Sequence, residues 1–344
     1  MGRTFITAGT LLLLLCCVRT GQAADPWPAE AWAAAETLTH LDSDFEKDMS
    51  GAAWNPQTKM FWVCCNKRPS AFWALTEDES NSFMIATNGS GTQAKYDLGK
   101  GDFEGICQVD YSEPTVYIMV EEDDQIREYD VSVYGSAVLN LQWNIAAHVP
   151  TSGGSGSEGI TFVPNEWLMK EHFVDGNETP YLSTNGMGGL MLVAHQNGGR
   201  VYAFDLNPTN SAFHFVGAYA TSRSESSGLE FDRSTGLLYI WHNTGPNYLE
   251  VTELSSYQDG AEKRLTPLAE FLGPKKRQPG GHRHRSDRHH EPLVPHCRRR
   301  QPGRRSPHVV QGIRAHQRFR RGRDGGFVGA GVSGEHNDLR WFRR

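Results

Sequence analysis

Short apolar runs recur along residues 50 to 272, and polar turn sequences separate them. The strongest runs lie at positions 60–63, 116–120, 190–194 and 237–241. They are rich in β-branched and aromatic residues, as strands are. Alternating apolar and polar residues follow two of them, at 126–131 and 201–206. No long stretch has the period of an amphipathic helix, so the pattern predicts an all-β fold.

A repeat organises these strands. Four segments place a glycine just before a short apolar strand: Ser-Gly-Ala-Ala-Trp, Glu-Gly-Ile-Cys-Gln, Glu-Gly-Ile-Thr-Phe and Ser-Gly-Leu-Glu-Phe. Their glycines, Gly51, Gly105, Gly159 and Gly228, are separated by 54, 54 and 69 residues. The longest interval contains a polar insertion at 164–189.

A period near 54 residues with three or four strands per unit is typical of propeller blades. A β-sandwich, the alternative, would not repeat one strand opening at this interval. The sequence therefore predicts a β-propeller over residues 24–274, with blades beginning near residues 50, 104, 158 and 227. The glycines have a physical reason there, because inner strands crowd around a central channel and only glycine lets their backbones approach closely.

Residues 275–344 do not continue the strand pattern. They carry 19 Lys and Arg against 5 Asp and Glu, and eight of the 14 histidines. Three interpretations compete: a basic tail that binds nucleic acid, a His-rich tail that binds metal, and a sequence read out of frame.

The genetic code favours the frame error. If the frame advances by one base, the codons of residues 277–286 can be read as Ala-Asn-Pro-Glu-Gly-Ile-Ala-Ile-Ala-Pro. This restores the Glu-Gly-Ile opening, about 53 residues after Gly228. We therefore expect a five-bladed propeller of which about four blades are in frame, with the fifth lost in a disordered basic tail at 275–344.

Composition then indicates the compartment and the partners. Residues 1–23 resemble a signal peptide, with Arg3, an apolar run at 11–18, and small residues before a predicted cleavage after Ala23. That run is too short to span a membrane, so we expect a secreted or periplasmic protein without a stable membrane span. Excluding 275–344, the chain has 35 acidic and 15 basic residues, which argues against nucleic acid and favours cationic partners.

Cysteines do not form a disulfide framework. Only Cys64, Cys65, Cys107 and Cys297 remain after the predicted cleavage. The neighbours Cys64 and Cys65 would point to opposite faces of a strand, so they are a poor mutual pair. We expect small buried residues and a fold that depends on its apolar core.

Carboxylates are the strongest candidates for chemistry. Asp102 and Glu104 precede the second blade, Glu158 precedes the third, and four acids at 121–124 end a strand. Blade strands converge on the axis, and converging carboxylates either raise their pKa values or hold a cation. Hard oxygen ligands suit Ca²⁺. A solvated acidic surface is the alternative, and the one we expect for the acids at 123–124.

Catalytic motifs are weaker. The sequence has no Gly-x-Ser-x-Gly elbow, phosphate-binding loop or dinucleotide fingerprint. His195 and His242 end matching strands, as candidate bases or metal ligands. We expect both to be polar residues at the channel mouth instead.

The chain resembles the SdiA-regulated β-propellers of bacteria, distant relatives of NHL-repeat propellers, over about residues 45–272. The matching stretches are Ser-Gly-Ala-Ala-Trp at 50–54 with Asn-Lys at 66–67, Asp-Phe-Glu-Gly-Ile at 102–106, Glu-Glu-Asp-Asp at 121–124, Glu-Gly-Ile at 158–160 with Val-Ala at 193–194, and Ser-Gly-Leu-Glu-Phe at 227–231 leading to 249–254. The resemblance implies five blades, export, and a calcium ion whose candidate ligands are Glu104, Glu122 and Glu158. The chain departs from the family pattern after His195 and His242, where the next residue is Gln or Asn rather than an acid.

These expectations give two functional hypotheses. The first is an exported, calcium-associated, non-enzymatic protein, monomeric when its propeller is intact, that binds a small ligand or an envelope protein. The second is a calcium-dependent propeller hydrolase of phytase-like or lactonase-like type, in which the acids and His242 would serve as metal ligands and base. Fold alone does not decide between them.

Overall fold

A computed structural model describes residues 24–25, 38–46, 48–66, 70–80, 82–151 and 155–273 of the chain. The predicted signal peptide at 1–23 lies outside the described residues, and so does the basic tail at 275–344. Among the described residues, no helix is long and apolar enough to cross a membrane.

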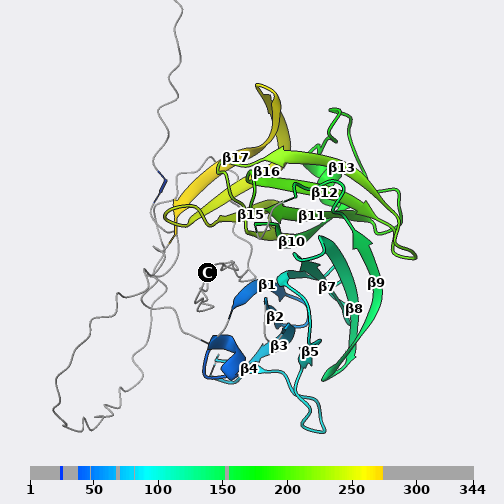
Figure 1. The fold of residues 1–344 in the computed structure, drawn as a ribbon, viewed down its shortest axis with the longest axis vertical. Coiled ribbons are helices and arrows are strands. Elements are labelled where there is room, and N and C mark those ends of the chain that lie inside the picture. The colour runs from blue at the N-terminus through cyan, green and yellow to red at the C-terminus, as the bar shows by residue number, and fades with distance from the viewer. Residues whose placement is uncertain are drawn as a thin grey trace, which may run out of the picture.

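The described strands form four antiparallel meanders in chain order, numbered 1 to 4 below (Figure 1). Meander 1 contains β1 (Met49–Asn55), β2 (Met60–Cys65), β3 (Ala71–Glu77), β4 (Phe83–Ile85) and β5 (Lys95–Asp97); meander 2 contains β6 (Phe103–Cys107), β7 (Thr115–Val120), β8 (Gln125–Val133) and β9 (Ser136–Asn144); meander 3 contains β10 (Ser157–Pro164), β11 (Gly189–His195), β12 (Arg200–Leu206) and β13 (Phe213–Ala220); meander 4 contains β14 (Gly228–Asp232), β15 (Leu237–His242), β16 (Tyr248–Asp259) and β17 (Glu262–Leu272). In meander 1, β4 and β5 both pair with β3. The prediction of an all-β fold is confirmed.

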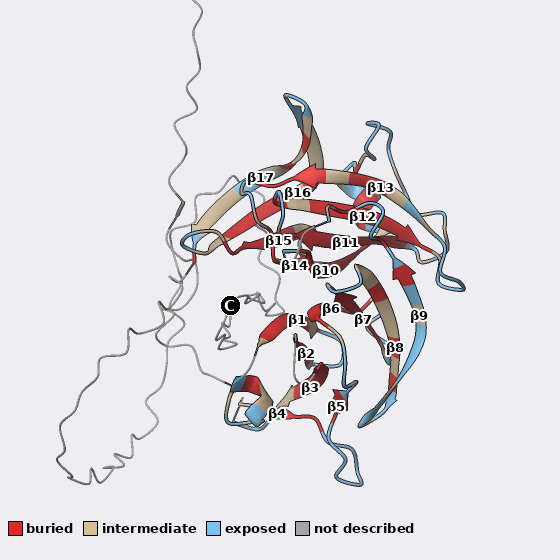
Figure 2. Cartoon of the chain, in the orientation of Figure 1, coloured by how far each residue is buried: buried red, intermediate tan, exposed pale blue. Residues whose placement is uncertain are grey.

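The meanders are arranged side by side, and their first strands β1, β6, β10 and β14 lie next to one another at the inner side, where Figure 2 labels them. A Cβ atom on Gly51 would lie 2.6 Å from the Cα of Gly105, and one on Gly159 would lie 2.7 Å from the Cα of Gly228. No side chain fits between backbones at these distances. The repeated glycines therefore have the predicted cause, and the arrangement is propeller-like.

Because successive side chains of a strand point to opposite faces, each meander can bury apolar side chains on both of its faces. In β2, Trp62 and Cys64 pack toward meander 2, whereas Phe61, Val63 and Cys65 pack on the opposite face. Similar apolar clusters fill the seams between meanders 2 and 3 and between meanders 3 and 4. Figure 2 shows the inner strands as mostly buried and β9 as mostly exposed.

The described cysteines behave as predicted. Cys64 and Cys65 lie in the clusters on opposite faces of β2. Both thiols, and that of Cys107, are buried and free. Burial raises the pKa of the Cys64 thiol well above its usual value, so it is an inert packing group.

The predicted insertion at 164–189 contains the helix α1 (Asn165–Lys170). Its Leu168 is buried in the seam between meanders 3 and 4. The ring of Trp167 packs edge-on against that of Phe231 at 6.0 Å. The insertion thus packs over the seam between meanders 3 and 4.

Residues from the beginning of the described chain contact both end meanders. The backbone of Asp25 accepts a 2.7 Å hydrogen bond from Leu272 and donates one of 2.8 Å to Glu270, both on β17. Leu38 and Phe45 are buried against the outer face of meander 1. The described residues that precede the first strand therefore contact both meander 4 and meander 1.

Candidate functional site

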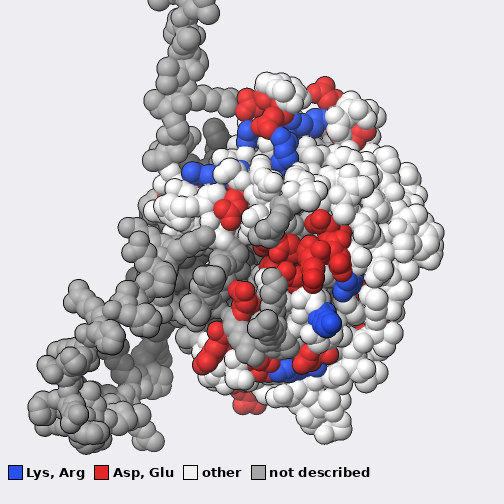
Figure 3. All heavy atoms as spheres, viewed as in Figure 1, with Lys and Arg blue, Asp and Glu red and all other residues white. Residues whose placement is uncertain are grey.

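Five carboxylates lie near one end of the inner strands, and together they are called the carboxylate cluster below. They are Asp102, Glu104, Glu121, Glu158 and Glu225. They come from the start of β6, the turn after β7, the start of β10 and the segment before β14. Figure 3 shows acidic atoms gathered near the middle of one face of the described molecule.

Asp102, Glu104 and Glu121 form the tightest part of the cluster. Each offers one carboxylate oxygen, and these oxygens lie within 4.8 Å of one another. Asp102 and Glu104 are only 5% and 3% exposed. Three oxygen ligands at this separation can contact one cation at once.

Glu104 is oriented by two neighbours from meander 1. Its carboxylate accepts hydrogen bonds from the Ser50 hydroxyl and from the side-chain amide of Asn66. The oxygen of that same amide is buried and has no hydrogen-bond partner among the described residues. A buried amide oxygen beside carboxylates is a further ligand of the type that Ca²⁺ takes.

Burial and mutual repulsion perturb these acids. Burial, with the charges of Asp102 and Glu121, raises the pKa of Glu104 to about 8, although the Ser50 hydrogen bond opposes this shift. The pKa of Glu158 is raised well above its usual value by burial first and then by Glu104 and the other cluster acids. These carboxylates therefore bind either protons or a cation at neutral pH.

Of the three predicted ligands, the structure brings Glu104 and Glu158 into the cluster and places Glu122 elsewhere. Glu122 is exposed, and it is not one of the three acids whose oxygens converge. Residues 121–124 form a turn in which the Asp124 amide bonds to the carbonyl of Glu121. Glu121, the first residue of the turn, follows β7 directly and stays with the other cluster acids, whereas Glu122, at the corner of the turn, faces solvent.

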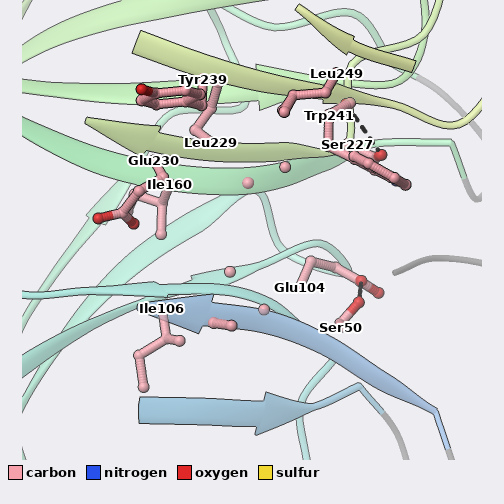
Figure 4. A pocket seen from close by; sticks show the side chains of 15 residues that line it. Ser50, Glu104, Ile106, Ile160, Ser227, Leu229, Glu230, Tyr239, Trp241 and Leu249 are labelled. Atoms are coloured by element: carbon pink, nitrogen blue, oxygen red, sulfur yellow. Dashed lines mark hydrogen bonds between the residues drawn. The ribbon is translucent and has the colours of Figure 1, made fainter. Parts of the chain in front are cut away.

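A narrow cavity of about 20 Å³ lies between the inner strands. Figure 4 shows Glu104 with Ser50 on one side of this cavity and Glu230 on the other, with Ile106 and Ile160 on the same side as Glu230. The backbones of the repeated glycines line much of its wall. Acidic side chains therefore lie on two sides of the cavity.

Glu230 also lines a second, smaller cavity of about 10 Å³. Burial raises the pKa of Glu230 to about 8, although the nearby Arg233 lowers it. The guanidinium group of Arg233 donates to the carbonyls of Gln108 and Val109 at 2.7 and 2.9 Å. Arg233 thus links meander 4 to meander 2. Sequence analysis did not single out this pair.

Both histidines expected at the channel mouth are fully buried. His195 Nδ1 accepts a 3.1 Å hydrogen bond from the Asn197 amide. Burial lowers the pKa of His195, which keeps it neutral at physiological pH.

His242 lies between a serine and a carboxylate, but the arrangement is not a catalytic triad. The Ser226 hydroxyl lies 3.4 Å from His242 Nδ1, and Glu250 lies 2.8 Å from Nε2. Nδ1 also lies 2.9 Å from the carbonyl of Glu225. A carbonyl only accepts, so Nδ1 carries the hydrogen and is no base toward Ser226.

No family model matches the chain. No curated protein matches it either. Similar solved structures include a putative 6-phosphogluconolactonase from Bacteroides fragilis (11% identity, 66% of this chain and 55% of that chain, TM-score 0.37) and a functionally unknown protein from Desulfotomaculum acetoxidans (12%, 65% and 56%, 0.37). The chain spans about half the length of these proteins. Likenesses at this level identify neither a family nor an activity.

Proposed function

We propose that this chain is an exported, calcium-associated β-propeller protein without enzymatic activity, related to the SdiA-regulated family. The observation that carries the proposal is the convergence of three carboxylate oxygens within 4.8 Å. Like charges so close, and so poorly hydrated, are stable together only when a proton or a cation neutralises them. One Ca²⁺ held by Asp102, Glu104 and Glu121 does this.

The ligand chemistry supports calcium over softer metals. The convergent groups are carboxylates, and a neutral candidate is the amide oxygen of Asn66, whose side-chain nitrogen donates to Glu104. Oxygen-only sets suit Ca²⁺, whereas zinc sites use thiolate or imidazole ligands. A bound Ca²⁺ would keep these acids ionised and leave coordination positions for an oxygen-bearing ligand or partner.

The proposal includes a five-bladed ring whose fifth meander is encoded in the shifted frame. On its face away from meander 3, meander 4 has a buried apolar cluster of Tyr239, Trp241, Leu249 and Val251, as a face that packs against a further meander would have. Five polar side-chain atoms of the same meander are buried without a hydrogen bond to any described residue, namely Thr244 Oγ1, Asn247 Oδ1, Glu250 Oε1, Thr252 Oγ1 and Ser256 Oγ. Unsatisfied buried polar atoms are costly, and a neighbouring meander would supply their partners.

Isothermal titration calorimetry of the full chain with CaCl₂ tests the metal claim. We expect binding heat and a calcium-dependent rise in melting temperature. Glu121→Gln should remove most of both signals, because it deletes one of the convergent charges. Glu122→Gln is the matched control, since it changes the exposed neighbour of the same type. Absence of calcium heat in a folded wild-type protein would overturn the proposal.

A substrate panel tests the absence of enzymatic activity. We expect no calcium-dependent turnover of phosphate esters, lactones or carboxyl esters. Turnover that Glu104→Gln abolishes while Glu122→Gln preserves it would establish the hydrolase instead.

A further inference from the structure

The chain has three Asn-Gly pairs, which begin at Asn88, Asn185 and Asn197. An asparagine before glycine can lose its side-chain amide, because glycine has no side chain to hinder the attack of its own backbone nitrogen on the asparagine Cγ. Asparagine is among the thermolabile residues of proteins. The reaction also needs a side chain that can rotate toward that nitrogen, so the folded structure decides which of the three pairs reacts.

Asn88 is exposed, but hydrogen bonds hold its side chain in one place. Its Oδ1 accepts from the amide of Ser90 at 3.1 Å, from the hydroxyl of Ser90 at 2.7 Å and from the amide of Thr92 at 2.8 Å. An asparagine side chain that bonds to the backbone two residues further on forms an Asx turn. All three bonds would have to rearrange before Cγ could reach the nitrogen of Gly89, so this turn protects Asn88.

Asn185 is held at both ends of its side-chain amide. Its Nδ2 donates to the carbonyl of Asp205 at 2.9 Å, and its Oδ1 accepts from Asn207 Nδ2 at 3.3 Å. The residue is also half-buried. Rotation of this side chain toward Gly186 would therefore break contacts between the insertion and β12.

Asn197 has neither protection. It lies in the turn between β11 and β12, it is exposed, and its side-chain amide has no hydrogen-bond partner among the described residues. Its backbone amide donates to His195 Nδ1 at 3.1 Å, which leaves the side chain free to rotate. Gly198 is exposed as well, and nothing lies within 4 Å of a Cβ atom added to it. The turn therefore has room for a ring to form between these two residues.

We propose that Asn197 is a site of spontaneous modification by water. The backbone nitrogen of Gly198 bonds to Cγ of Asn197, the bond from Cγ to Nδ2 breaks, and the leaving group takes up the proton of the Gly198 amide and departs as ammonia. Water then opens the five-membered succinimide ring. Opening at the bond from nitrogen to Cγ gives aspartate, and opening at the bond from nitrogen to the backbone carbonyl carbon gives isoaspartate. The net reaction consumes one water and releases one ammonia.

The modified turn adjoins the carboxylate cluster. The amide of Gln196 donates to the carbonyl of Gly156 at 3.0 Å, and the amide of Gly156 donates to Glu121 Oε1 at 2.6 Å. Either product adds a negative charge near these acids. Isoaspartate also adds one carbon to the backbone of the turn that sets His195 opposite Arg200. We expect both changes to lower the melting temperature. The site itself does not depend on calcium binding.

Mass spectrometry of the folded, full-length protein tests the site. The protein is incubated at 37 °C and pH 8, circular dichroism establishes that it stays folded, and fragment spectra of its peptides assign each modified residue. We expect Asn197 to gain the mass difference between an amide and a carboxyl group, while Asn88 and Asn185 stay intact over the same period. The reaction should be slower at pH 6, because the attacking backbone nitrogen has to lose its proton.

Guanidinium chloride provides the matched control, because it removes the structure and keeps the sequence. In the unfolded chain all three asparagines should react at similar rates. Equal rates at the three sites in the folded protein would overturn the proposal. Faster reaction at Asn88 or Asn185, or an Asn197 that stays intact, would overturn it as well.

Two variants connect the modification to stability. Asn197→Gln would need a larger ring, so it should stay unmodified and keep its melting temperature during the incubation. Asn197→Asp carries the new charge without the extra backbone carbon, so wild-type protein that contains isoaspartate should melt below it. If the wild type and Asn197→Gln lose stability equally during the incubation, the expected effect of the modification on stability is wrong.

Discussion

A Cβ atom on Gly105 would lie 2.6 Å from the carbonyl oxygen of Glu158. The backbone of meander 2 therefore touches that of meander 3 at a residue that also supplies a cluster carboxylate. The close approach of the inner strands therefore also brings together the acids that these strands carry at their first residues.

We predict that Gly105→Ala destabilises the protein by about 1–3 kcal/mol, the usual cost of overpacking. The atoms in the way are backbone atoms of Glu158 and Ile160, which cannot rotate aside. Gly89→Ala is the control, since nothing lies within 4 Å of its added Cβ. Urea unfolding followed by circular dichroism measures both. Equal midpoints for the two variants would contradict close contact at the axis.

The sequence predicted the meanders because their causes are local. Strand alternation, turn residues and the repeated glycines are visible along the chain, and the opposite faces of Cys64 and Cys65 follow from the period of a strand. Glu104 and Glu158 were found because they precede two of the glycines.

The parts of the site that sequence reasoning missed depend on tertiary geometry. Glu121 and Glu122 are chemically identical neighbours, and only the turn after β7 decides which one stays near the axis. The link from Arg233 to carbonyls of meander 2 joins residues 124 and 125 positions apart. Glu225 was detectable in principle, since it lies three residues before Gly228, as Asp102 does before Gly105.

We expect Glu230 to make the free energy of unfolding fall as the pH rises. Burial raises its pKa from about 4.5 to about 8 in the folded protein, so the folded state keeps a proton that the unfolded chain releases. Its contribution to the free energy of unfolding is fully present below about pH 4.5 and is lost as the pH rises toward 8. Glu230→Gln cannot ionise, and it should melt at a higher temperature than the wild type at pH 8.

Melting curves at pH 5 and pH 8 check this prediction. The gap between Glu230→Gln and the wild type should be larger at pH 8 than at pH 5. Glu122→Gln serves again as control, because that side chain is exposed. A constant gap at both pH values would show that Glu230 does not titrate in this window.

We expect that replacing the charged side chain of Arg233 lowers the free energy of unfolding substantially. Its guanidinium group donates to two backbone carbonyls and lies 4.0 Å from the ring centroid of Tyr111. Hydrogen bonds that involve a charged group contribute about 1.5–3 kcal/mol, so Arg233→Met should lower the free energy of unfolding by about that amount.

Arg200→Met is the matched control for Arg233. Arg200 pairs with Glu262, and the two side chains are 28% and 44% exposed, so the loss should be within about 1 kcal/mol. Chemical denaturation of both variants gives the comparison. Similar losses would mean that the contact between meanders 2 and 4 contributes little.

The N-terminal residues predict a processed protein. Export through a signal peptide would remove residues up to Ala23, so the mature chain should begin at Ala24. N-terminal sequencing of protein recovered from the periplasm or medium of an expressing bacterium checks the cleavage. Replacing Ala23 with Arg should block processing, because the cleavage position needs a small residue. Retention of Met1 in the exported protein would contradict the prediction.

Advancing the reading frame by one base before the codon for Arg277 should stabilise the protein. The restored sequence would place a meander beside the apolar cluster of meander 4 and beside buried polar atoms such as Asn247 Oδ1 and Thr252 Oγ1, which have no hydrogen bond within the described part of the chain. Each such atom costs about 1–3 kcal/mol when unsatisfied. We expect a higher melting temperature and a sharper transition than for the chain with residues 275–344 as they stand. An unchanged transition would mean that meander 4 needs no fifth partner, and the basic tail would then be the native sequence of a ring that does not close in this way.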